Sequence, residues 1–414
     1  MSKKFFIKRL IFLVLLLIGI FSLQCSKKPI STKPDVPPDL SLVEKKLIES
    51  DNSFGLKLFK EMVQEEKHEN VFISPLSVSM ALGMTYNGAN GETQEAMAKT
   101  LELEGLSIQE VNQCYKNLIE SLTSLDPKVR FQIANSIWYR MGLTPREEFL
   151  NLCQQYFNAL VRGLSFNDPS SADTINAWVD ENTNGKIKQI VDKPIDPSIV
   201  MFLINAIYFK GMWTYQFDKE KTKDDWFYSP AYHLPIPCKM MEQRIFCNYF
   251  NNDTFQAVEL PYGDGDFSML ILLPHWSTDI DSLVAQFDPD KLNYWMSCFR
   301  KDSVDIYFPK FKLEYELSLN EVLMALGMGI AFSGAADFSK MGLDVFISEV
   351  KHKTFVEVNE EGTEAAAVTV VIMCTSANSP SGFRVDRPFI FMIRENKSNT
   401  ILFIGKIVDP TSSS

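Results

Sequence analysis

Residues 358–373, VNEEGTEAAAVTVVIM, combine features of a strand and of a loop. Residues 368–372 are mostly β-branched and favour a strand, yet a glycine, a threonine and three alanines precede them. In an extended segment alternate residues share a face, which places Thr363, Ala365 and Ala367 together. A strand that enters a sheet end first buries its leading side chains, and an unpaired charge there would cost several kcal/mol. We therefore predict a segment that resides in a loop but can become a strand.

The N-terminus is predicted to lie outside the folded domain. Four basic residues precede the apolar run Leu10–Leu23, and Cys25 with a Pro-rich stretch follows it. This order is typical of a secretory signal peptide. The run is shorter than the roughly 20 residues of a membrane span, which favours a cleaved signal over an uncleaved anchor. We expect a signal peptide at 1–24, a linker at 25–40 and a single domain at 41–414.

Cys25 leaves two interpretations open. Its place after the apolar run resembles a bacterial lipoprotein signal, in which this cysteine is acylated. Alternatively, the protein is secreted and Cys25 is incidental. Both interpretations predict a location outside the cytoplasm. Only the first predicts contact with a membrane, through the lipid anchor.

The net charge and the spacing of the cysteines restrict the ligands that the protein is expected to bind. The formal net charge is −11, so nucleic acid and heparin are not expected to bind. The remaining cysteines lack CxxC spacing, so no metal is expected, and buried free thiols are favoured. A disulfide between Cys238 and Cys247 would require a hairpin tip at Glu242 and Gln243. The six cysteines after Cys25 are Cys114, Cys153, Cys238, Cys247, Cys298 and Cys374.

The sequence lacks the common catalytic motifs. The sequence contains no G-x-S-x-G, H-E-x-x-H, G-x-G-x-x-G or P-loop pattern. None of the four histidines lies in a recognised catalytic motif; they are His68, His233, His275 and His352. We therefore expect neither an enzyme nor a cofactor, and interpret the first three histidines as surface or structural residues.

Helices are predicted first and strands later. Ser41 and Glu44 have the spacing of a capping box, and Ser74 precedes a proline at a second predicted helix start. A third helix is expected over 173–184. From Val200 onward, short apolar or alternating runs bounded by turn residues are typical of strands. This order favours one α+β domain.

Four motifs of this chain resemble those of the serpins, a family of metastable inhibitors of serine proteases. They occur in the same order as in that family. In serpins the reactive loop is known to insert into a β-sheet as an additional strand. The resemblance implies a serpin fold with three β-sheets, about eight or nine helices and an exposed reactive-centre loop. The motifs are NVFISPLSVSMALGMTYNGANGETQEAM (70–97), NAIYFKGMWTYQFD (205–218), VEVNEEGTEAAAVTV (356–370) and VDRPFIFMI (385–393).

The resemblance also implies three groups of site residues. Asn205 lies inside an otherwise apolar strand, where its side-chain amide needs a hydrogen-bond partner. The resemblance places it in a polar cluster called the "shutter", which would supply that partner. The competing interpretation is ordinary capping by Ser74 and a surface His352. In the "breach", an ion pair between Lys310 and Glu360 is expected. The implied shutter is Ser74, Ser77, Asn205 and His352; the breach is Trp213, Lys310 and Glu360; the loop hinge is Glu360, Gly362, Thr363, Glu364, Ala365, Ala366 and Ala367.

The reactive bond is predicted from the family's loop length. Counting from the two ends of the loop gives Ser376–Ala377 or Ala377–Asn378. These residues are small and uncharged, whereas trypsin-like enzymes require Lys or Arg, and Arg384 is too distant. We expect a monomer that traps elastase-like serine proteases. The alternatives are an inhibitor of papain-like cysteine proteases and a non-inhibitory serpin acting as a carrier or chaperone.

Overall fold

The computed structural model describes residues 40–231, 234–363 and 381–412. Several predictions therefore lie outside the described residues. These are the signal peptide and linker, the lipidation site Cys25, His233, the hinge residues Glu364, Ala365, Ala366 and Ala367, Cys374, and the reactive-bond residues Ser376, Ala377 and Asn378.

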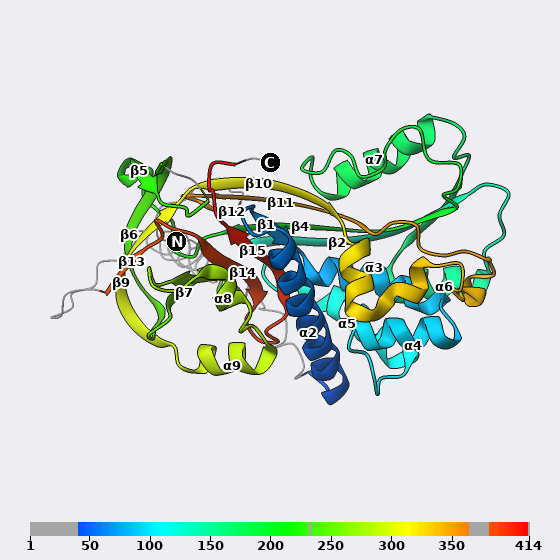
Figure 1. Cartoon of the computed structure of the whole chain (residues 1–414), viewed down its shortest axis with the longest axis horizontal. Coiled ribbons are helices and arrows are strands. Elements are labelled where there is room, and N and C mark those ends of the chain that lie inside the picture. The colour runs from blue at the N-terminus through cyan, green and yellow to red at the C-terminus, as the bar shows by residue number, and fades with distance from the viewer. Residues whose placement is uncertain (1–39, 232–233, 364–380, 413–414) are drawn as a thin grey trace, which may run out of the picture. The chain divides into compact units, whose positions relative to one another are not determined.

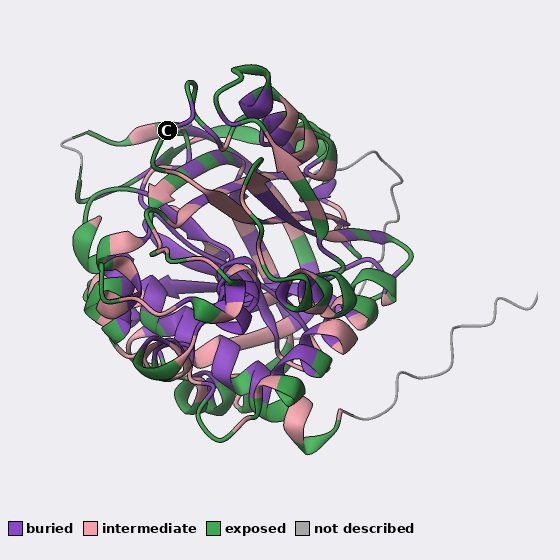
Figure 2. Ribbon diagram, turned by 90° about the vertical axis from the view of Figure 1, so that its right-hand side faces the viewer, coloured by how far each residue is buried: buried purple, intermediate pink, exposed green. Residues whose placement is uncertain are grey.

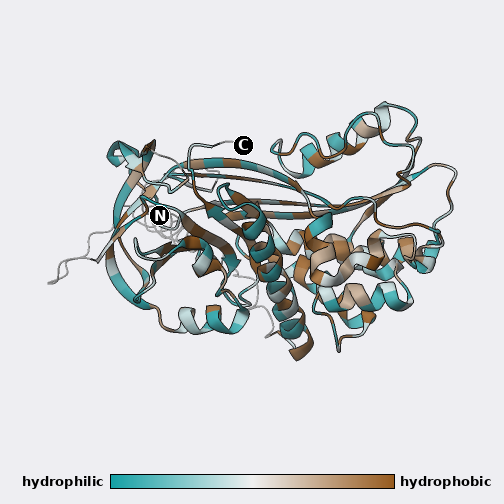
Figure 3. Ribbon diagram, in the orientation of Figure 1, coloured by the Kyte–Doolittle hydropathy of each residue, from teal (hydrophilic) through white to brown (hydrophobic). Residues whose placement is uncertain are grey.

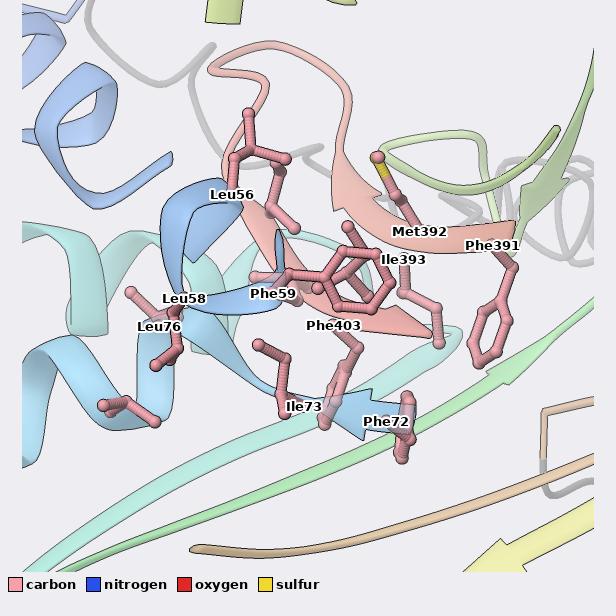
Figure 4. Close-up of a cluster of buried hydrophobic side chains, with 14 of the residues drawn as sticks. Leu56, Leu58, Phe59, Phe72, Ile73, Leu76, Phe391, Met392, Ile393 and Phe403 are labelled. Atoms are coloured by element: carbon pink, nitrogen blue, oxygen red, sulfur yellow. The ribbon is translucent and has the colours of Figure 1, made fainter. Parts of the chain in front are cut away.

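The first helix begins at the predicted capping box. Ser41 Oγ accepts a hydrogen bond from Glu44 N, and the Glu44 carboxylate accepts one from Ser41 N. The apolar face of this helix is buried, and Figure 4 shows Leu58 beside Leu76 and Phe59 beside Phe403. The described α-helices are α2 (Leu42–Glu65), α3 (Pro75–Gly88), α4 (Gly91–Thr100), α5 (Ile108–Ser124), α6 (Glu147–Phe157), α7 (Ser170–Asn182), α8 (Ile280–Val284), α9 (Pro289–Ser297) and α10 (Asn320–Leu323).

A six-stranded sheet has the order β10-β11-β12-β4-β2-β3. Along β10 buried apolar residues alternate with exposed charged ones, and Figure 3 shows the alternation as brown and teal segments. The two-residue strand β12 pairs with β11 on one side and β4 on the other. Among the described residues no register pairs β11 directly with β4. The strands are β10 (Phe311–Ser318), β11 (Lys351–Asn359), β12 (Gly362–Thr363), β4 (Met201–Met212), β2 (Val129–Arg140) and β3 (Leu160–Leu164).

The other described strands form a nine-stranded sheet. The serpin resemblance implied three sheets, but hydrogen bonding joins the described strands into two. The reason is β6, which is 16 residues long and pairs with β5, β7 and β9 along different parts of its length. The strands are β1 (Val71–Ile73), β15 (Ile401–Ile407), β14 (Phe389–Glu395), β8 (Phe267–Pro274), β7 (Phe255–Tyr262), β6 (Ile236–Asn251), β9 (Arg300–Pro309) and β13 (Ser381–Arg384), with β5 (Lys223–Phe227) paired to β6.

Helices cover both faces of the six-stranded sheet (Figure 1). Helix α7 packs over β2 and β4 through a small apolar cluster that includes Trp138, Ile175 and Val179. Helix α3 lies against the opposite face, within the large core that fills the space between the two sheets. Buried residues gather where helices and sheets meet, and exposed ones lie outside (Figure 2). Residues 40–414 form one compact unit.

One helix boundary is corrected, and the free thiols that the sequence favoured over a disulfide are confirmed for the described cysteines. Helix α7 begins at Ser170 rather than at residue 173, because the Asp168 carboxylate accepts a hydrogen bond from Ser170 N and starts the helix earlier. Cys238 and Cys247 both lie on β6, which continues as an unbroken strand between them, so the hairpin and the disulfide are not formed. The described free thiols are Cys114, Cys153, Cys238 and Cys247, which are buried, and Cys298, which is partly exposed. None of the described helices is long and apolar enough to cross a membrane.

Candidate functional site

Gly362 and Thr363 occupy the position in the sheet where a strand would begin to enter. Gly362 has a φ of 150°, and a Cβ there would lie 2.2 Å from the Gly211 carbonyl oxygen, so only glycine fits. Thr363 is 3% exposed, and its Oγ1 lies 2.6 Å from the hydroxyl of the buried Tyr262. The start of the predicted hinge is thus already held as a strand between β11 and β4.

The predicted ion pair of the breach is present. Lys310 Nζ lies 2.9 Å from the buried carboxylate of Glu360, and Thr222 Oγ1 donates to the same carboxylate at 2.7 Å. Burial alone would raise the pKa of Glu360, but the hydrogen bonds from Lys310 and Thr222 outweigh it and hold that pKa below its usual value. Glu360 is therefore stabilised in its charged form at the top of β11.

Trp213 holds the turn between β11 and β12. Its indole nitrogen donates to the Asn359 carbonyl at 3.0 Å, and its backbone nitrogen donates to the Glu361 carbonyl at 2.9 Å. The ring stacks on Tyr262 with centroids 4.5 Å apart. Trp213 thus holds the backbone of the hinge, and Tyr262 holds its Thr363 side chain.

A second ion pair, which the sequence did not predict, holds the hinge as well. Lys219, in the 3-10 helix η1 (Lys219–Lys221), pairs with the carboxylate of Glu361. Glu361 is buried, whereas Lys219 is largely exposed. The pair raises the pKa of Lys219, through the hydrogen bond first and the charge of Glu361 second. Two adjacent glutamates of the hinge therefore bond to two different lysines.

In the predicted shutter, Ser74 and His352 are in contact. Ser74 is the N-cap of α3, its backbone nitrogen donates to His352 Nε2 at 3.0 Å, and its Oγ donates to the Leu402 carbonyl at 2.7 Å. Burial lowers the pKa of His352 to about 4, so the ring is neutral near pH 7. Ser74 both caps the helix and binds β11, and His352 is buried rather than at the surface.

Asn205 has different partners from those expected. Its Nδ2 donates to Asn135 Oδ1 on β2 at 2.8 Å, and its own buried Oδ1 has no hydrogen-bond partner. Ser77 Oγ donates to the Asn205 carbonyl at 3.5 Å. The polar cluster therefore links α3 to β4 and α3 to β11 separately, with no hydrogen bond between Asn205 and His352 among those described. Asn135 was missed, although it too is an amide within an apolar run.

A cavity of about 320 Å³ lies beside this cluster. It is lined by residues of α3, β4 and β11, among them Ser77, Asn205 and His352. Because no register joins β4 to β11 among the described residues, the cavity marks space along the sheet below β12. The other described histidines do not join it: His68 is exposed, and His275 Nε2 lies 2.8 Å from the Asn252 carbonyl oxygen.

Comparison with known proteins decides the family. A family model described as "Serpin (serine protease inhibitor)" matches residues 49–410. The chain belongs to the serpin family. This serpin is 34% identical over 371 residues to Iripin-3 of Ixodes ricinus, a match that covers 87% of this chain and 94% of that protein. The family model describes inhibitors of serine proteases, which are not themselves enzymes, so the partner that membership implies is a protease.

Two solved structures support the same assignment of fold. The thermophilic serpin tengpin in its native state matches with 34% identity and a TM-score of 0.79, over 88% of this chain and 94% of that one. Human thyroxine-binding globulin, complexed with thyroxine, matches this serpin with 28% identity and a TM-score of 0.81, over 89% and 100% of the two chains. The α+β serpin fold predicted from the sequence is confirmed.

Proposed function

We propose that this serpin traps elastase-like serine proteases as a suicide substrate, and that the strand begun by Gly362 and Thr363 extends between β11 and β4. The supporting observation is β12 itself. It pairs with both neighbours at the end of the sheet, while β11 and β4 have no register of their own among the described residues. A sheet in this state has a place for one more strand.

In the proposed mechanism, the serine of the protease attacks the carbonyl carbon of the reactive bond. The peptide bond breaks, the new amino terminus leaves, and an acyl-enzyme remains. Before water hydrolyses that ester, residues after Thr363 add to β12. About 15 residues at about 3.3 Å each would carry the protease some 50 Å. Each ladder hydrogen bond contributes on the order of 1 kcal/mol, so the native protein is a kinetic trap.

Specificity for elastase-like enzymes is supported by the small residues Ser376, Ala377 and Asn378. The test is inhibition of elastase and trypsin side by side, followed by denaturing electrophoresis. The proposal predicts a band with elastase at the summed mass less the C-terminal fragment released by cleavage, and no such band with trypsin. As a matched change, Ala377→Arg should create a trypsin-inhibiting variant if Ala377 fills the primary pocket. Potent trypsin inhibition by the wild type, with elastase untouched, would refute the specificity.

A non-inhibitory carrier is the second candidate, because thyroxine-binding globulin is among the structural matches. The two functions differ in the behaviour of the cleaved chain. A carrier predicts no covalent complex with any serine protease and no gain in thermal stability after loop cleavage. An inhibitor predicts both a covalent complex and a gain in thermal stability after loop cleavage.

We further propose that the protein acts outside the cytoplasm as a monomer, held to a membrane by acylation of Cys25, and that heparin plays no part. The signal-like N-terminus and the net charge of −11 support this. Cys25→Ala should move the protein from the membrane to the soluble fraction. Heparin should leave the inhibition rate unchanged, and size-exclusion chromatography should give the monomer mass.

A further inference from the structure

Three aromatic side chains near the C-terminal end of β5 are exposed to an unusual degree. Trp226 is 51% exposed, Tyr228 is 43% exposed and Trp276, which follows β8, is 68% exposed. Phe227 between the first two is fully buried, so the alternation along this segment turns Trp226 and Tyr228 to the same outer side. Large exposed aromatic groups are a mark of interaction surfaces. We call Trp226, Tyr228 and Trp276 the aromatic patch.

The aromatic patch is attached to the segment that follows β13. Asp225, next to Trp226, pairs with Arg384, the last residue of β13. Tyr228 N donates to the Asp386 carbonyl at 2.7 Å. The Arg387 guanidinium lies 4.8 Å from the centre of the Trp276 ring.

Further contacts join Tyr228 to Trp276 and the patch to β8. The rings of Tyr228 and Trp276 meet edge to face at 6.1 Å. Arg387 also donates from Nε to the Pro274 carbonyl at 2.8 Å, which fixes the end of β8 beside it. The patch is thus a preorganised surface next to the residues where the chain re-enters the sheet, and Figure 1 shows β5 and β13 at the same end of the molecule.

We propose that the aromatic patch is a second contact site for the target protease, apart from the reactive bond. This inference rests on the proposed function. From Ala377 to Arg384 is seven residues, which span at most about 25 Å. A protease domain of about 230 residues is about 45 Å across. An enzyme bound at the reactive bond therefore extends over the surface on which Arg384 and its neighbours lie.

The chemistry of the patch suits a protein partner. Trp and Tyr are among the residues most often responsible for binding energy at protein interfaces, and Trp276 and Tyr228 supply both in one contact group. The largely buried Arg387 holds the Trp276 ring in place. Their positions are fixed by the bonds to residues 384–387, so little conformational entropy is lost on binding. The patch is expected to stabilise the first, non-covalent complex, which forms before the acyl-enzyme.

The test is the second-order rate constant for elastase inhibition by a Trp226→Ala, Trp276→Ala double variant of the full chain. We expect at least a tenfold fall in this rate constant, with an unchanged melting temperature and an unchanged final yield of covalent complex. The matched control is Tyr294→Ala, which removes an exposed aromatic ring from α9 and should leave the rate unchanged. A Trp226→Phe, Trp276→Phe variant should retain most of the rate.

A failure of the proposed function can be distinguished from a failure of the second contact site. If the wild type forms no complex with elastase, the proposed function fails. If complexes form normally and the double variant reacts at the wild-type rate, the second contact site is refuted. In a Cys25→Ala background, which removes the proposed acylation site, binding to phosphatidylcholine vesicles that the double variant loses, with equal inhibition rates, would also refute it and assign the patch to a membrane surface.

Discussion

Replacement of Thr363 by arginine should convert this inhibitor into a substrate. Thr363 is 3% exposed and its hydroxyl bonds to that of the fully buried Tyr262. Loss of this bond leaves a buried hydroxyl without a partner, at about 1–3 kcal/mol. The unpaired guanidinium adds a burial cost of several kcal/mol. Because Thr363 is already buried in the native sheet, this cost should first release β12 from the sheet. Insertion must then bury the arginine, and at least about 3 kcal/mol added to that barrier slows insertion by a factor of about 10².

The acyl-enzyme of the Thr363→Arg variant should hydrolyse before insertion, because water attack is not slowed by the substitution. Titration of elastase should then require many molecules of inhibitor per enzyme, and electrophoresis should show cleaved inhibitor in place of the complex. Thr363→Ser keeps a small side chain with a hydroxyl and should inhibit as the wild type does. An unchanged complex yield for Thr363→Arg would refute the reasoning that Thr363 leads a strand into the sheet.

Three further substitutions test the hinge and the buried ionisable groups. Gly362→Ala places a Cβ 2.2 Å from the Gly211 carbonyl oxygen and should displace β12, seen as faster amide exchange at Thr363; wild-type exchange would contradict it. The pKa of His352 is lowered to about 4, so its contribution to stability is complete above pH 6.5 and is lost as pH falls toward 4, on the order of 3 kcal/mol; His352→Gln should lack this part of the fall in unfolding free energy, and an identical pH profile would contradict it. Burial raises the pKa of Asp51 to about 7, so stability falls as pH rises from about 4 to 7; Asp51→Asn should raise the melting temperature at pH 8, and no rise would contradict it.

Features set by neighbouring residues were predictable from the sequence. The caps at Ser41 and Ser74 were expected because a capping side chain and its backbone partner lie within three residues of each other. The Lys310–Glu360 pair came from the serpin resemblance, not from local pattern, since its partners are 50 residues apart. The α+β class followed from the change in periodicity along the chain.

Contacts between distant segments were not predictable. Tyr262 reads as an ordinary core residue of an apolar run, and nothing near it indicates a bond to Thr363, which lies 101 residues later. Lys219 lies among several charged residues, so its pairing with Glu361 had no distinguishing signal. The hairpin that a Cys238–Cys247 disulfide would have required is absent because residues 242–243 pair with β9, a partner that the local sequence does not reveal.

The most direct test of strand insertion is the thermal stability of the chain after loop cleavage by a metalloprotease, which forms no acyl-enzyme and is not trapped. About 15 added ladder hydrogen bonds of on the order of 1 kcal/mol each should raise the melting temperature of a domain of this length by about 20 °C. Insertion predicts a rise of that size in the cleaved protein. Equal melting temperatures for the cleaved and intact protein would contradict it.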